Sequence, residues 1–172
     1  VVQEMIDISY GMPCFTYLFP KKEEYEKVVV KGCFPLTPLC AYALLHISEK
    51  IAQNERSIFT FLTSKEQGSL SRVMGKEKQI FVGIDAIYDY FKPLFKESND
   101  QPQIHNEWLK ADYALHKVTE PAEKQIIKAI SMIQMLRREE ELPVTDEAIQ
   151  AALGMEETVY KKAMQQLCKQ QI

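Results

Sequence analysis

The sequence predicts a mainly α-helical protein, with at most a short strand or hairpin. Apolar residues recur at helical spacing through most of the chain, as at Leu44, Ile47 and Ile51. Residues typical of helix starts precede several of these segments, as Thr37 and Pro38 do here. Beyond residue 103 the apolar pattern is helical throughout. These three observations together favour an all-helical chain.

The composition indicates a folded protein with a sizeable core. The 172 residues are 46% hydrophobic and 26% charged, which is enough for one good core or two small domains. The net charge of -3 gives no broad positive field for nucleic acid or an anionic membrane. No apolar run approaches the length of about 18 residues that a membrane helix needs, so we expect no membrane partner.

The start of the chain and its cysteines bear on its origin. Residues 1–9 lack an initiator Met and a signal-like apolar core, and they resemble the middle of a helix, so we expect a piece of a longer protein. No cysteine pair has C-x-x-C spacing, which favours buried free thiols over disulfides or zinc ligands and predicts a cytoplasmic protein. The four cysteines are Cys14, Cys33, Cys40 and Cys168.

The first thirty residues predict two helical segments with ambiguous ends. A short helix gives way to a Gly-Met-Pro break at 11–13, and the apolar run 14–19 fits either a strand or a helix. Residues 21–30 begin as a charged helix and end in three valines, which could instead be a short strand. Gly32 ends this segment, since glycine tolerates a positive φ.

The next segments predict a core helix and then a shorter one. Thr37 caps a helix with Pro38 in its first position, running to about residue 52. A second helix begins at Asn54, its predicted cap, and a polar, Gly-containing loop at 64–69 ends it. A helical turn is possible at 69–74. The second helix should bury a stripe at helical spacing, widened by a fourth residue. The stripe is Ile58, Phe59 and Leu62, and Phe61 widens it.

The middle of the chain holds its best strand candidate and its clearest break. Residues 80–84 are the strand candidate, and Asp85 should cap a short helix at 86–91 before Pro93. The polar segment 97–103 contains the break. We therefore predict a lid-like helical domain over residues 1–98 and a winged-helix-like domain over residues 104–172.

The second domain should consist of helices only. One helix carries Trp108 on its apolar face, and Thr119 caps the next. The charged run 137–141 should be a solvated helix end. Thr145 then caps a helix over 146–153, Gly154 forms the turn, and a last helix over 156–170 has Val159, Ala163 and Leu167 inward. This order is a helix-turn-helix, and the chain ends about where a wing would begin.

Arg56 is the leading candidate for a binding residue. In a helix it stands in the first turn, beside the apolar stripe, which would pack its base and leave its guanidinium free. Such a group suits bidentate contact with a phosphate or a carboxylate. The alternative is an ordinary surface arginine paired with Glu49 or Glu55.

The surrounding residues resemble a known class of ATPase. Arg56 followed by apolar residues at +2, +3, +5 and +6 is similar to the sensor-2 helix of AAA+ ATPases, although residues 53–55 here read Gln-Asn-Glu where Gly-Asp-x would stand. The block 34–39, Phe-Pro-Leu-Thr-Pro-Leu, together with Asn54-Glu55-Arg56, resembles large bacterial P-loop ATPases, many uncharacterised and some linked to phage defence. Those proteins usually have a histidine where Thr37 stands.

The resemblance implies a nucleotide-sensing lid with a winged-helix-like domain attached. Arg56 would contact the γ-phosphate, with Asn54 capping its helix, and ATP and Mg²⁺ would bind the complete protein. An upstream P-loop domain of the same polypeptide, and other subunits, are the implied partners. The nucleotide machinery itself is absent, because Gly75-Lys76 stands without the rest of G-x-x-x-x-G-K-[ST]. We predict no catalytic residue, no metal site and no ATP hydrolysis in these 172 residues.

Two other functions remain open from the sequence. The helix-turn-helix could bind DNA or RNA through Lys161, Lys162 and Gln165, but Glu156 and Glu157 occupy the end of the helix that usually enters the groove. That arrangement favours a structural or protein-contact role for these helices. The third possibility is a helical protein-interaction scaffold without a nucleotide role.

Overall fold

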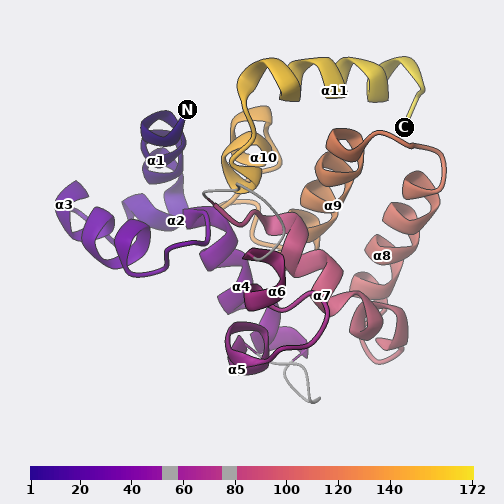
Figure 1. Ribbon diagram of the computed structural model, residues 1–172, viewed down its shortest axis with the longest axis horizontal. Helices are drawn as coiled ribbons and strands as arrows, with labels where there is room; N and C mark the ends of the chain where they lie inside the picture. The colour runs from indigo at the N-terminus through magenta and orange to yellow at the C-terminus, as the bar shows by residue number, and fades with distance from the viewer. Residues whose placement is uncertain (52–57, 75–80) are drawn as a thin grey trace.

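The computed structural model describes residues 1–51, 58–74 and 81–172, and these are arranged almost entirely as helices (Figure 1). The predicted mainly α class is confirmed. The strand expected at 80–84 is reduced, within the described residues, to an isolated parallel bridge between Leu36 and Val82. Ile84 already belongs to the following helix. The described part of this apolar run therefore leads into the helix that begins at Ile84.

The amino-terminal segments are short helices. They are α1 (Val2–Gly11), α2 (Pro13–Thr16), α3 (Lys22–Tyr25) and the π-helix η1 (Glu26–Lys31). The three valines are thus helical. Gly32 follows η1 with a φ of -72°, so its tolerance of a positive φ is not used. A Cβ at Gly32 would collide with the carbonyl oxygen of Val28, and close approach is the reason for glycine there.

Helix α4 (Pro38–Ile51) follows the prediction closely. The backbone N–H of Cys40 donates to Thr37 Oγ1 at 3.2 Å, which is the expected cap. Leu44 and Ile47 lie in the core, as their spacing predicted. The Thr37 cap therefore fixes the start of α4, and one face of the helix is buried.

Helices α5 (Ile58–Thr63) and α6 (Leu70–Met74) are short. The stripe predicted on α5 is wrong at Phe59, which is 73% exposed, and at Leu62, which is 40% exposed. Ile58 is half-buried against the core, and Phe61, predicted to widen the stripe, is fully buried. Phe61 packs edge-on against Tyr90 with ring centroids 5.2 Å apart. Phe61 therefore sets the face that α5 turns toward the core.

Helix α7 (Ile84–Glu97) is longer than predicted. Its N-cap is Gly83, so the expected capping role of Asp85 is wrong, and Pro93 lies inside the helix instead of ending it. Phe91 and Phe95, on either side of Pro93, are fully buried. Packing of this face offsets the hydrogen bond that proline removes.

The remaining helices are α8 (Pro102–Leu115), α9 (Pro121–Leu136), α10 (Asp146–Leu153) and α11 (Glu157–Lys169). Glu120, and not Thr119, is the N-cap of α9. Thr145 caps α10 as expected, with Ala148 N–H donating to Thr145 Oγ1 at 3.2 Å. Helix α11 buries Tyr160 in place of the expected Val159.

The break predicted at 97–103 falls in the turn between α7 and α8. Helices from both sides of it pack together: α7 contacts α8 and α9, and α10 contacts α1 and α4. The buried residues form one hydrophobic cluster. The division into domains at 98 and 104 stays a prediction. In the structure, a common core spans that boundary.

Candidate functional site

The two residues of the predicted phosphate sensor, Arg56 and its cap Asn54, lie outside the described residues. The described chain leads up to them with α4, which ends at the buried Ile51, and continues after them with α5. Helix α5 is anchored by Phe61 and by a hydrogen bond of 2.9 Å from Tyr90 Oη to Thr60 Oγ1. Its Phe59 faces solvent and is free for a further contact.

A buried polar joint lies at the start of α4. Thr37 is fully buried, and its hydroxyl donates to the carbonyl oxygen of Ala152 in α10 at 2.8 Å while it accepts from Cys40 N–H. The Thr37 N–H donates to the carbonyl oxygen of Val82 at 3.0 Å. Three segments far apart in sequence therefore meet at one threonine, with its polar groups satisfied.

Two glycines allow this joint to close. Gly154 has a φ of +63°, and a Cβ there would stand 3.3 Å from the Thr37 methyl group. Gly83 lies against the end of α10, where a Cβ would stand 2.9 Å from the carbonyl oxygen of Leu153. The distance of 2.9 Å at Gly83 is shorter than normal contacts between a Cβ atom and a backbone oxygen, so a side chain at this position would collide. The turn of the helix-turn-helix is thus locked onto the segments before α4 and α7.

An acidic side chain, Asp85, lies half-buried beside the joint. Burial raises the pKa of Asp85, while the hydrogen bond from Gln125 Nε2 to Asp85 Oδ2, 3.1 Å long, lowers it. The nearby Asp89 also raises the pKa of Asp85, and Lys128 lowers it. Lys128 itself pairs with Asp89 at 2.7 Å. Asp85 therefore carries a cost of ionisation in the folded state, which one amide only partly offsets.

A second polar cluster ties the loop after α9 to α4. Tyr42 Oη donates to the Glu141 carboxylate, and Arg138 Nη1 donates to both Glu141 oxygens at 3.1 and 3.2 Å. The Tyr42 hydrogen bond is the largest influence lowering the pKa of Glu141. The backbone N–H of Cys14 also donates to the Glu141 carbonyl. The charged run 137–141 is therefore more than a solvated helix end.

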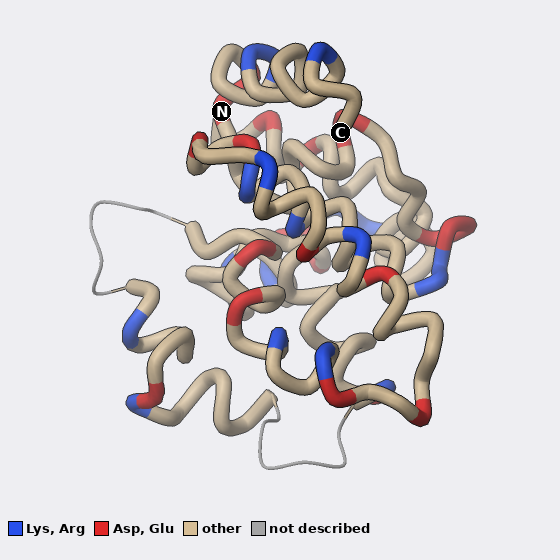
Figure 2. The backbone as a smooth tube through the Cα atoms, turned by 90° about the vertical axis from the view of Figure 1, so that its right-hand side faces the viewer, with Lys and Arg blue, Asp and Glu red and all other residues tan. Residues whose placement is uncertain are grey.

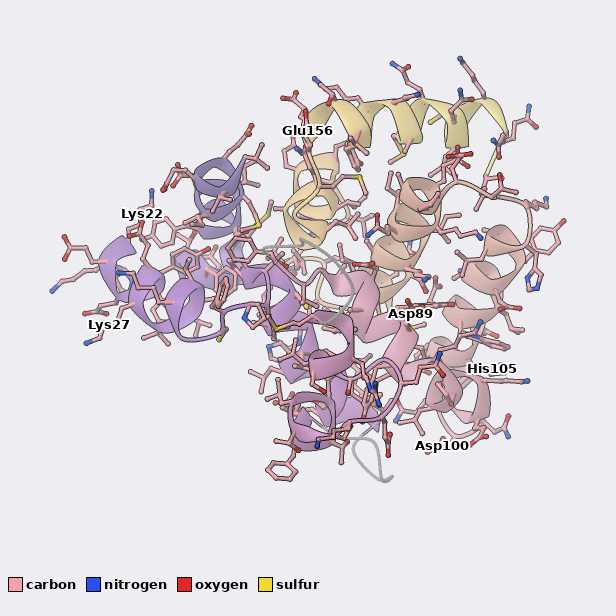
Figure 3. The ribbon with its side chains drawn as sticks, in the orientation of Figure 1. Lys22, Lys27, Asp89, Asp100, His105 and Glu156 are labelled. Carbon is pink, nitrogen blue, oxygen red and sulfur yellow. The ribbon has the colours of Figure 1, made fainter. Side chains whose placement is uncertain are left out.

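The candidate nucleic-acid residues lie together on the outer surface of α11. Lys161, Lys162 and Gln165 are all exposed, and Lys161 forms an ion pair with Glu157. Glu156 stands at the amino-terminal end of this helix (Figure 3). Acidic and basic residues are interspersed over the described chain (Figure 2). The three side chains form a small basic and amide patch next to acidic groups.

The described ranges hold no candidate metal-binding cluster and no candidate membrane helix. No group of three or more His, Cys, Asp and Glu side chains in them could hold a metal ion, and no helix in them is long and apolar enough to cross a membrane. All four cysteines are free; Cys14 and Cys40 are buried, whereas Cys33 is half-buried and Cys168 is exposed. Burial raises the pKa of the Cys14 thiol to about 12. The expectation of buried thiols thus holds for two of them.

Comparisons with known proteins assign this chain to no family. No protein-family model matches the chain. The search of curated proteins gave no match, and neither did the search of solved structures. Functional inference therefore rests on the residues and on their arrangement.

Proposed function

We propose that this chain is the nucleotide-sensing lid and regulatory or interaction module of a larger cytoplasmic P-loop ATPase. Arg56 would contact the γ-phosphate of ATP bound with Mg²⁺ to an upstream domain of the same polypeptide. The resemblance of residues 32–62 to such ATPases is the starting point for this proposal. Such a lid must transmit a small shift at the γ-phosphate to the other helices of the chain.

The observation that carries the proposal is the Thr37 joint. Helix α4 begins at this joint and leads to the segment that contains Arg56. Because Thr37 binds α10 through Ala152, a shift of α4 would be passed to the helix-turn-helix without a flexible linker. The exposed Phe59 on α5 leaves an apolar contact for the upstream domain. This arrangement supports a lid that moves as one body.

The test is ATP hydrolysis by a polypeptide that joins this chain to its own upstream coding region. Arg56→Ala should lower kcat by about 10- to 1000-fold while nucleotide binding is retained, because the lost contact acts on the transferring phosphate. Arg56→Lys should recover only part of that loss. The 172-residue chain alone should show no turnover. Hydrolysis by this chain, or full activity of Arg56→Ala, would contradict the proposal.

Nucleic-acid binding is the second candidate, and the exposed patch on α11 is the observation in its favour. Lys161→Glu and Lys162→Glu would weaken salt-dependent binding to duplex DNA if that patch is used. Glu156→Lys would strengthen it. Titration of labelled duplex at two salt concentrations separates this function from the lid, because Arg56→Ala should leave DNA affinity unchanged.

A further inference from the structure

We draw no further inference here: the strongest candidate, the apolar groove of about 350 Å³ that α8, α9 and α11 line with side chains such as Ala114, Ile130 and Met164, carries nothing because nothing in the structure shows what covers it.

Discussion

Helix α5 and the Thr37 joint are both attached to the same core, but in opposite ways. Helix α5 is held by one fully buried ring, Phe61, and by the Tyr90–Thr60 hydrogen bond, and it leaves Phe59 in solvent. Thr37 is fully buried and joins α4, α10 and the segment before α7 through paired polar groups. Helix α5 packs on the core through Phe61 and the half-buried Ile58, whereas Thr37 joins three distant segments through directed hydrogen bonds. Loss of the Phe61 contact should therefore loosen one short helix, whereas loss of the Thr37 contacts should loosen several segments at once.

The largest expected effect contrasts two phenylalanines of equal burial. Phe91→Ala, in the middle of α7, should lower the free energy of unfolding by about 3–5 kcal/mol because it leaves a cavity in the common core. Phe61→Ala should mainly release α5, with a smaller loss in global stability. Denaturant unfolding measures the first effect, and amide hydrogen exchange of residues 58–63 measures the second. If both variants lost the same free energy of unfolding, α5 would contribute to global stability as the core does, and the contrast between them would not hold.

The next effect tests the Thr37 joint itself. Thr37→Val keeps the shape of the side chain but leaves the Ala152 carbonyl and the Cys40 N–H without their partner, at a cost of about 1–3 kcal/mol. Thr37→Ser, which keeps the hydroxyl, should cost less. Hydrogen exchange in α10 should rise in the valine variant only. If both variants behave alike, the methyl contact and not the hydrogen bonds holds the joint.

A smaller effect is expected at the cap of α10, away from the joint. Thr145→Ala removes the acceptor for Ala148 N–H and should lower stability by about 1 kcal/mol. Thr145→Asp, which supplies another capping oxygen, serves as the control and should restore most of it. The thermal midpoint reports both. No loss in the alanine variant would mean that packing alone holds this helix end.

The smallest effect depends on pH. Because the folded protein raises the pKa of Asp85, it holds that proton more tightly than the unfolded chain. The contribution to stability is complete below the ordinary value of 3.8 and is lost as the pH rises through the raised value. Asp85→Asn should therefore raise the thermal midpoint at neutral pH by a few degrees, and this gain should shrink toward pH 4. A gain that is constant with pH would rule out ionisation as its cause.

Local signals predicted the helices that have strong caps and regular stripes. Thr37 and Pro38 mark the start of α4, and Thr145 and Gly154 mark the two ends of α10, because capping depends on groups within a few residues. The same local logic failed at Pro93 and Asp85. There the burial of Phe91 and Phe95 extends α7 through a residue that normally ends a helix. A sequence pattern does not show whether the free energy gained by burying these two phenylalanines exceeds the cost of the hydrogen bond that proline removes.

The candidate sites also divide into features that the sequence predicted and features that only the tertiary structure showed. The amino-acid sequence by itself determined the mainly helical class and the order of the last two helices, because these depend on periodicity and short motifs, whereas the role of Arg56 stays a prediction. Only the tertiary structure decided that Thr37 contacts Ala152, that Tyr42 binds Glu141, and that α8, α9 and α11 enclose a groove. These contacts join residues distant along the chain, and no local pattern contains the packing that brings them together.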